Sequence, residues 1–359
     1  MSPFFVLNGT MKKHLLLKLI AVSFLFALIL TSCNKANEKQ QYSAYSMDCF
    51  DTVITIVGYE DSKEKFDEVA DSVLAELQEY HRLYTIYHRF DGLENLCTIN
   101  ELVDGEHRTV KVDKRIVDML LYAKEMYYLT DGTVNVAMGS VLSLWHNYRS
   151  IGMDDPKNAS LPPMEKLKDA ALHMDIESIV IDEENCTVTI TDPLTKLDVG
   201  AIAKGYATEQ VARRLEEQGV TGYVLNVGGN VRTIGSKKDD IPWTVGLENP
   251  DGGEYIEYLH LAGQSVVTSG SYQRFYYVDG KNYHHIIHPE TLMPAEGYLS
   301  VSVICEDSGL GDALSTALFC MEQEKGLSLV EAMSGVEVLW VYDDGSKTSS
   351  SGWNQYVKK

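Results

Sequence analysis

The chain has 359 residues, enough for one large domain or two ordinary ones, and its 45% hydrophobic residues can form a sizeable core, which argues against global disorder. The formal net charge of -21 argues against a nucleic-acid partner, because binding to phosphate backbones needs a basic surface. Any anionic ligand of this protein therefore needs a local group of positive side chains or a bound cation.

The N-terminus has the features of an export signal. The basic segment MKKH at 11–14 precedes an apolar run over 15–30, which ends in Leu30-Thr31-Ser32-Cys33. Small residues directly before a cysteine resemble the lipobox of bacterial lipoproteins, which implies cleavage before Cys33 and attachment of a lipid to this residue. The alternative is a transmembrane helix, but the apolar stretch is short and is flanked like a signal.

This segment predicts the domain organisation and the location. Residues 1–32 would be a lipoprotein signal peptide, residues 33–43 a polar tether, and residues 44–359 one folded unit without a second linker. The lipid would anchor this unit to the extracytoplasmic face of the cell membrane. The five cysteines after Cys33 are scattered and form no CxxC pair, so we expect neither a disulfide framework nor a cysteine metal site.

The first part of the folded unit alternates between strand and helix patterns. Phe66, Val69, Val73 and Leu77 keep helical spacing, which predicts an amphipathic helix. The apolar segment over 134–145 fits either a strand or a helix. In chain order we predict a strand within 45–59, helices over 63–84, 113–130 and 164–174, and a β-hairpin over 178–190.

The centre of the predicted fold is the stretch LDVGAIAKGYATEQVARRLEEQGVTGYVLNVGG. We interpret it as a strand over Leu197–Ile202, a tight turn, a helix that ends near Gly219, and a second buried strand over 223–227. Lys204 lies at the helix start, where N–H groups and the helix dipole attract anions. Asp198 lies just upstream, where a carboxylate would be costly without a partner. The alternative is a plain packing unit with a solvated lysine.

The C-terminal part contains hairpin patterns and one unusually apolar helix. We predict paired strands within 243–261, a hairpin over 275–287, strands over 299–305 and 336–342, and a helix over 310–321 that is capped by Ser308.

The helix over 310–321 is apolar nearly all round, which indicates burial. Asp312 and Thr316 are four residues apart and are therefore neighbours on its surface. A carboxylate and a hydroxyl one turn apart are hard oxygen ligands, which suit Mg²⁺. The alternative is that Asp312 hydrogen-bonds to backbone groups and Thr316 only fills space.

The histidines of His284-His285-Ile286-Ile287-His288 give weak support for a zinc site, because Pro289 and the isoleucine pair favour a strand over an HExxH helix. No GxxxxGK[ST], GxGxxG or GxSxG motif occurs, so ordinary nucleotide-kinase, Rossmann and hydrolase functions lack support.

Several motifs together resemble the ApbE family of FAD:protein FMN transferases. They are DVGAIAKGYATEQ followed by NVGGN, then TSGSYQRFYYVDGKNYHHIIHPETLMPA, then DALSTALF, in the order and spacing of the family. SMDCFDT, LYTIYHRFDGLENLCTIN and DGTVNVAMGSVLSLW are similar to further family segments, so the likeness covers about residues 44–350. The resemblance implies an α+β fold, with mixed sheets and packed helices in a single T-fold-like catalytic unit.

The resemblance also implies an activity. The family transfers FMN from FAD to a threonine or serine hydroxyl of a target protein, forms a phosphodiester bond, releases AMP and requires Mg²⁺. The expected partners are therefore FAD and a flavin-acceptor protein, a redox protein in the membrane or outside the cytoplasm.

The resemblance assigns roles to particular residues. The family's metal ligands match Asp312, Thr316 and the backbone carbonyl of Ala201, and its FAD contacts match Met47, Tyr87, Thr133, Val134, Asn135, Asp198, Lys204 and Ile286. Tyr87 could stack on a flavin or adenine ring, and a core tyrosine is the plain alternative. Asp198 and His285 are both candidates for the general base, and neither is preferred.

Two positions depart from the family pattern. His288 stands where the family has the aspartate of HIIDP, and Asn135 stands where it has the aspartate of DPTVG. Neither change removes a proposed metal ligand. Two rival functions remain: hydrolysis of FAD to FMN and AMP at the same site, and non-enzymatic binding of flavin by a lipoprotein.

Overall fold

The computed structural model describes residues 39–101, 108–250 and 252–359. The predicted signal peptide over 1–32, Cys33 and the first part of the predicted tether lie outside these residues. Within the described ranges, no helix is long and apolar enough to cross a membrane.

The largest element of the fold is an antiparallel sheet of eight strands. In spatial order it contains β1 (Gln40–Ser46), β2 (Ile54–Glu60), β6 (Tyr223–Val227), β7 (Asn230–Ile234), β10 (Ser265–Gly270), β13 (Tyr298–Cys305), β14 (Glu337–Tyr342) and β15 (Lys347–Ser349). Strand β1 pairs with β2 along its whole length, so the last four residues of the predicted tether belong to the sheet and are not a linker.

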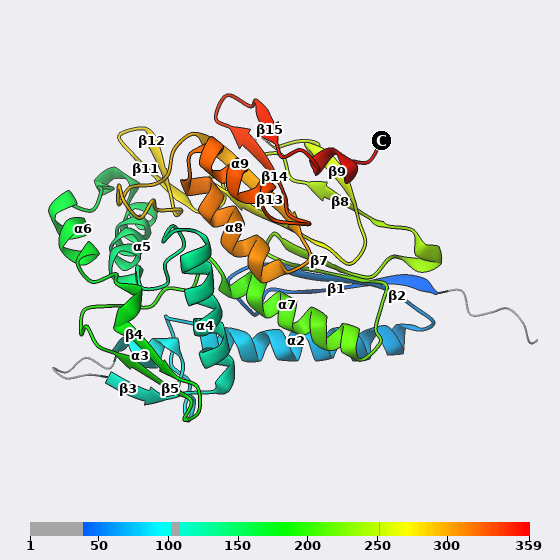
Figure 1. Cartoon of the computed structure of the whole chain (residues 1–359), viewed down its shortest axis with the longest axis horizontal. Helices are drawn as coiled ribbons and strands as arrows, with labels where there is room; N and C mark the ends of the chain where they lie inside the picture. Colours follow the sequence, from blue (N-terminus) through cyan, green and yellow to red (C-terminus); the bar gives the residue numbers. More distant parts are fainter. Residues whose placement is uncertain (1–38, 102–107, 251) are drawn as a thin grey trace, which may run out of the picture.

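Four helices lie along one side of this sheet (Figure 1). They are α2 (Lys63–Tyr84), α7 (Ala203–Glu217), α8 (Ser308–Cys320) and α9 (Gln323–Glu331). Helix α8 packs against β10, β13 and α7, and α7 in turn packs against β7 and α2. A second apolar cluster, which includes Leu259, Ile304 and Trp353, joins the hairpin β8–β9 (Trp243–Leu247, Glu257–Leu261) to the large sheet.

A group of smaller elements lies at one end of the sheet, on the left of Figure 1. It contains α3 (Leu96–Glu101), α4 (Lys114–Leu129), α5 (Gly139–Asp154), α6 (Met164–Ala171), the sheet β3–β5–β4 (Arg108–Lys111, Thr187–Ile190, Ile179–Asp182) and the hairpin β11–β12 (Phe275–Val278, Lys281–His284). Short 3-10 turns complete the chain at Pro156–Asn158, Ile176–Ser178, Lys238–Asp240 and Trp353–Gln355.

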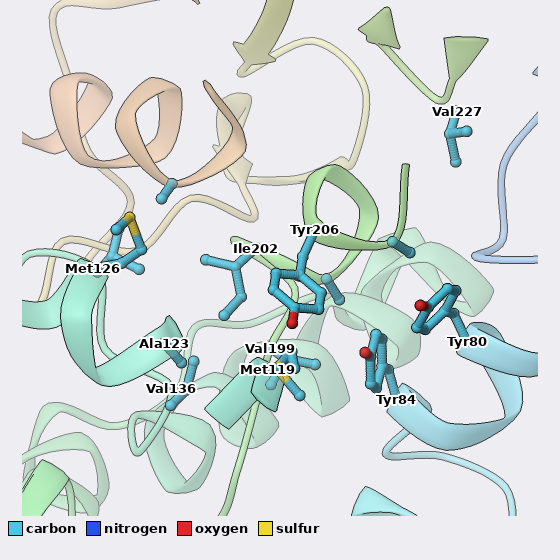
Figure 2. Close-up of a cluster of buried hydrophobic side chains, with 14 of the residues drawn as sticks. Tyr80, Tyr84, Met119, Ala123, Met126, Val136, Val199, Ile202, Tyr206 and Val227 are labelled. Carbon is cyan, nitrogen blue, oxygen red and sulfur yellow. The ribbon is translucent and has the colours of Figure 1, made fainter. Parts of the chain in front are cut away.

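One apolar core joins α3, α4 and the sheet β3–β5–β4 to the helices of the large sheet, whereas a separate apolar cluster, which includes Trp145, Leu167 and Tyr276, joins α5, α6 and the hairpin β11–β12. Figure 2 shows side chains from α2, α4 and α7 meeting in the first of these, among them Tyr84, Met119 and Tyr206, together with Ile202 just before α7. The α+β fold class predicted from the sequence is confirmed, and every pairing between named strands of the described chain is antiparallel.

Most of the local predictions are confirmed. The helix over 63–84 has the predicted bounds, and the helix over 113–130 forms with Asp113 as its N-cap. The undecided segment over 134–145 is a turn followed by the first half of α5. Both hairpins form, and so do the late strands.

Two local predictions are wrong. Leu197–Ile202 is not a strand, and it forms no part of a strand–helix–strand unit. Its backbone instead hydrogen-bonds to a turn and to a side chain: the Asp198 N–H donates to the carbonyl of Val136, and the Leu197 N–H donates to the side chain of Asn100. Helix α8 is capped by Asp307, whose carboxylate accepts from the Leu310 N–H at 2.9 Å, because Ser308 is already inside the helix.

A buried ion pair connects the sheet to α7 and α8. Arg232 on β7 and Glu209 on α7 are both buried, with 3.0 Å between Nε and Oε2. Glu209 also accepts a hydrogen bond from the Ser308 N–H at 2.9 Å, so its carboxylate ties the first residue of α8 to α7. This pair holds the two helices in register.

We expect Arg232→Met to lower the free energy of unfolding by about 3–5 kcal/mol, because it leaves the Glu209 carboxylate buried without its main partner. The control is Arg213→Met, which removes a second partner of Glu209. Because the Arg213 side chain is 52% exposed, this change should lower the free energy of unfolding by only about 0–1 kcal/mol. Urea unfolding followed by circular dichroism measures both. Equal losses in the two variants would show that the buried pair has no special role.

Candidate functional site

A cavity of about 470 Å³ opens between the N-terminus of α7, the middle of α8 and the smaller elements at the end of the sheet. Its walls come from segments far apart in the sequence: the turn over 50–52, residues 84–87, the segment over 133–138, α5, residues 198–204, the start of β7, the end of β10, residues 285–287 and α8. Such a convergence of separate segments is typical of a ligand site.

With one exception, the described residues assigned to the site from the sequence line this cavity. They are Tyr87, Thr133, Val134, Asn135, Asp198, Ala201, Lys204, His285, Ile286, Asp312 and Thr316. The exception is Met47, which is 76% exposed and does not line the cavity. The chain turns into the cavity only after Met47, through Phe50 and Asp51, whose left-handed backbone (φ 57° and 49°) reverses its direction.

Asp312 is brought to the cavity by the close approach of α7 and α8. A Cβ atom at Gly205 would lie only 2.3 Å from the carbonyl oxygen of Ser308, so the helices can meet here only at a glycine. The Gly205 N–H donates to Oδ2 of Asp312 at 2.8 Å, and Nζ of Lys204 lies 3.5 Å from the same carboxylate. The carboxylate therefore satisfies an N–H group in the first turn of α7, whose own N-cap residue supplies no side-chain acceptor.

Asp312 is only 4% exposed, and burial raises the pKa of its carboxyl group. The ammonium of Lys204 and the Gly205 N–H oppose this shift by stabilising the charged form. The sequence analysis left open that Asp312 only hydrogen-bonds to the backbone, and such a hydrogen bond, from the Gly205 N–H, is present. It uses Oδ2, while Nζ of Lys204 lies 3.5 Å from Oδ1.

The oxygen atoms around Asp312 are of the kind that hard cations prefer. Thr316 lies one turn further along α8, and its hydroxyl is 3.3 Å from Oγ of Ser269 at the end of β10. Ala201 lines the same cavity. Within the described residues, no group of three or more histidine, cysteine, aspartate or glutamate side chains is placed so that it could hold a metal ion. This donor set fits Mg²⁺, which takes few protein carboxylates and completes its shell with water and phosphate oxygens.

Asp198 lies in the irregular segment before α7. Its carboxylate accepts a hydrogen bond from the Gly200 N–H at 2.9 Å. Burial raises its pKa, while the Gly200 N–H and the positive charges of Arg149 and Arg274 act in the opposite direction. Asp198 is thus a carboxylate whose proton affinity depends on the charge of the cavity.

His285 is half-buried, and Nδ1 of its ring is a buried atom without a hydrogen-bond partner within the described residues. Burial lowers its pKa to about 3, and the positive charges of Arg149, Arg274 and Lys204 contribute to the same shift. The imidazole is therefore neutral at physiological pH.

The two departures from the family pattern have structural roles here. Nδ1 of His288 accepts a hydrogen bond from the Glu290 N–H at 3.1 Å, as the chain turns away from the cavity. Asn135 donates to the carbonyl of Met174 at 2.8 Å and accepts from the Ala137 N–H at 2.9 Å. The Asn135 side chain therefore shapes the turn before α5 through backbone contacts.

The sequence analysis missed two arginines of the cavity. Arg149 comes from α5 and Arg274 from the loop after β10, and with Lys204 they make the positive group that an anionic ligand needs in this acidic protein. The Arg274 guanidinium donates to the carbonyl of Asp51 at 3.3 Å. The sequence contained one signal for Arg149. It follows Trp145 by four residues, so on a helix the two side chains lie on the same face, and Trp145 also lines the cavity.

Tyr87 is 51% exposed at the edge of the cavity, so the alternative of a core tyrosine is wrong. Its ring lies beside the ring of His146, with 5.1 Å between centroids and 32° between planes. Arg149 lies close by, with 3.2 Å between one guanidinium nitrogen and Nδ1 of His146. This surface can receive a planar aromatic group.

Comparison with known proteins agrees with the geometry. A family model described as the ApbE family matches residues 50–340. A protein named FAD:protein FMN transferase from Klebsiella pneumoniae is 33% identical over 271 residues, which cover 72% of this chain and 81% of that protein. One of the same name from Vibrio cholerae is 29% identical over 340 residues, covering 92% of this chain and 97% of that protein.

Solved structures share the fold. The crystal structure of the ApbE protein from Thermotoga maritima matches with a TM-score of 0.77 at 30% identity, covering 89% of this chain and 100% of that one. The flavin transferase ApbE from Vibrio cholerae matches with a TM-score of 0.73 at 24% identity, covering 89% of this chain and 99% of that one.

We expect the His285 ring to show no titration between about pH 5 and pH 8, because its pKa is about 3 and the ordinary value is about 6.5. As the pH falls, the unfolded chain protonates this imidazole at a higher pH than the folded chain does. The contribution of His285 to the free energy of unfolding is therefore undiminished above about pH 6.5 and decreases as the pH falls toward 3. Proton NMR of the histidine ring signals tests this, with His285→Gln as the assignment control. A His285 signal that titrates near pH 6.5 would contradict the expectation.

Proposed function

Because the chain belongs to the ApbE family, we propose that this enzyme transfers FMN from FAD to a threonine or serine hydroxyl of a target protein. The observation that carries the proposal is the convergence in one cavity of Asp312 and Thr316 with a group of three cationic side chains. Oxygen ligands for a divalent cation beside Lys204, Arg149 and Arg274 suit a substrate with a charged diphosphate.

The proposed reaction exchanges one phosphorus–oxygen bond for another. The hydroxyl oxygen of the acceptor attacks the phosphorus on the FMN side of the FAD diphosphate, and a phosphodiester bond forms. The bond from this phosphorus to the bridging oxygen breaks, and AMP leaves with the electron pair. The hydroxyl proton passes to a base, and no redox change takes place.

The chain's own residues would bind and orient the diphosphate. Lys204, Arg149 and Arg274 would neutralise its charge, and Lys204 does so at the N-terminus of α7, where the helix dipole adds to the effect. Asp312, Thr316 and the carbonyl of Ala201 would hold Mg²⁺. When bound, Mg²⁺ would stabilise the negative charge that develops on the leaving phosphate.

The flavin and adenine groups would lie along the cavity walls. Tyr87, with His146 beside it, offers an aromatic surface at the open edge. The segment over Thr133–Asn135 and the side chain of Ile286 form part of the wall. These contacts would fix the distance between the diphosphate and the cavity mouth, through which the acceptor hydroxyl must enter.

Asp198 and His285 are the candidates for the proton acceptor. Burial makes Asp198 a stronger base than an ordinary aspartate. His285 is a weak base while Lys204, Arg149 and Arg274 are uncompensated, and the FAD diphosphate would offset that part of its pKa shift. If Asp198 is the base, Asp198→Asn removes the ascending limb of the pH–rate profile; if His285 is the base, His285→Gln removes it.

We expect Asp312→Asn to reduce FMN transfer at least about 100-fold, because it removes the only carboxylate of the proposed cation site. Pure protein is incubated with FAD, Mg²⁺ and a candidate acceptor domain, and the acceptor mass is followed for a covalent FMN adduct. Asp118→Asn, which changes a carboxylate paired with Lys114 outside the cavity, is the control and should retain full activity.

The same assay separates the rival functions. Release of free FMN at equal rates with and without the acceptor would favour FAD hydrolysis. Unchanged transfer by Asp312→Asn would contradict the proposed mechanism, and FAD binding without transfer or hydrolysis in the wild type would favour a flavin-binding protein.

We also propose that the enzyme acts while anchored by a lipid on Cys33 at the extracytoplasmic face of the cell membrane, on a redox protein located there. The LTSC motif after the basic and apolar segments supports this location. Strand β1 starts at Gln40, so only the polar segment over 34–39 would lie between a lipid on Cys33 and the large sheet.

We expect Cys33→Ala to move the protein from the membrane fraction to the soluble fraction after expression in a bacterium that processes lipoproteins, because it removes the cysteine of the LTSC motif to which the lipid would be attached. Immunoblotting of the two fractions measures the distribution, and Cys49→Ala, which changes a buried cysteine of the folded unit, is the control. Retention of the Cys33→Ala protein in the membrane would argue for a different anchor.

A further inference from the structure

Asn230 is the first residue of β7 and lies directly after the Gly228–Gly229 turn. Its side chain lines the cavity, and the residue is only 1% exposed. Strand β7 pairs with β10, where Asn230 lies opposite Val267, two residues before Ser269. Asn230 therefore enters the site from the sheet, while Asp312 and Thr316 enter it from α8.

The orientation of the Asn230 amide is set by its neighbours. Nδ2 faces the carbonyl oxygen of Val227 at 3.4 Å, and the side chain's other polar partner is the nearby Asp312 carboxylate, whose charged form it favours. Both partners are acceptors, so the NH₂ group must face them. The reversed amide would place its oxygen against a carbonyl and a carboxylate, and these would repel it.

This orientation leaves Oδ1 of Asn230 without a hydrogen-bond partner among the described residues. A buried amide oxygen without a hydrogen-bond partner lowers the free energy of unfolding, and native proteins seldom contain such an oxygen. The amide oxygen is also a hard ligand of the same class as the carbonyl of Ala201 and the hydroxyl of Thr316. The partner that suits it is a divalent cation or a water molecule bound to one.

We propose that Asn230 supplies a further oxygen ligand to the divalent cation of this site, directly or through a cation-bound water molecule. This assignment deepens the proposed function and rests on it. The Nδ2 group would hold the Asp312 carboxylate in place while Oδ1 faces the cation. A side chain with both contacts would couple the orientation of Asp312 to the binding of the metal.

The Asn230 side chain carries no charge, and the proposal also predicts what a charged side chain would do at this position. A carboxylate at this position would attract a divalent cation more strongly, but it would stand beside Asp312 and repel a diphosphate. Asparagine keeps one negative charge in the cation site and leaves the positive group of Lys204, Arg149 and Arg274 unopposed. Asn230→Asp should therefore change the affinities for cation and diphosphate in opposite directions.

The test measures binding, without any flavin transfer. Isothermal titration calorimetry with Mn²⁺ uses the folded chain purified without FAD, alone and with ADP, a diphosphate that carries no flavin. We expect Asn230→Ala to weaken Mn²⁺ binding about tenfold. We expect Asn230→Asp to strengthen Mn²⁺ binding at least about threefold and to weaken ADP binding in EDTA by a similar factor, as a charge near the site would do.

Ser308→Ala is the matched control. Its hydroxyl is also buried without a partner in the described chain, and it lies on α8 but does not line the cavity. This variant should bind Mn²⁺ as the wild type does. Thermal midpoints of all the variants show whether each one is folded, and if Asn230→Ala does not fold, Asn230→Asp decides the question.

The proposal is overturned if Asn230→Ala binds Mn²⁺ within twofold of the wild type, if Ser308→Ala weakens binding equally, or if Asn230→Asp shifts both affinities in the same direction. Failure of the wild type to bind Mn²⁺ with or without ADP also overturns it. If the Mn²⁺ affinities respond as expected but no acceptor receives FMN, the proposed function fails and the cation site stands.

Discussion

The site depends on one short contact, the hydrogen bond from the Gly205 N–H on α7 to the carboxylate of Asp312 on α8. It forms only because Gly205 has no side chain, so that the backbone of α8 can lie against α7. The same contact places Asp312 beside Lys204 and satisfies an N–H group at the start of α7. A larger residue at Gly205 would separate the helices and with them the two halves of the site.

Long-range support for this contact comes from the buried pair of Arg232 and Glu209. Glu209 lies one turn after Gly205 on α7 and accepts from the Ser308 N–H, one turn before Asp312 on α8. The buried charges therefore hold α7 against α8 one turn away from the contact between Gly205 and Asp312. A buried ion pair adds little net stability compared with two apolar side chains in the same place. The role of the pair of Arg232 and Glu209 is therefore better explained as fixing the register of α7 and α8.

The protein and its proposed substrate are both negatively charged and would repel each other. The cavity offsets this repulsion with a local group of positive side chains. Arg149, Arg274 and Lys204 come from three separate segments and converge on one space. Charges on the exposed surface are screened within about 8 Å at physiological ionic strength, whereas charges in a partly closed cavity are screened less. A local positive group can thus dominate the potential at the diphosphate while the whole chain remains acidic.

The sequence by itself determined the helices, hairpins and strands that depend on local periodicity, and it placed Asp312 and Thr316 one turn apart on a buried helix. It failed at Leu197–Ile202, which has a strand-like pattern but whose hydrogen bonds go to a turn and a side chain. Only the tertiary structure decided that Arg149, Arg274 and Asn230 meet at the same cavity. Periodicity reports which face of an element is buried, but the order of strands and the approach of α7 to α8 decide which buried faces meet.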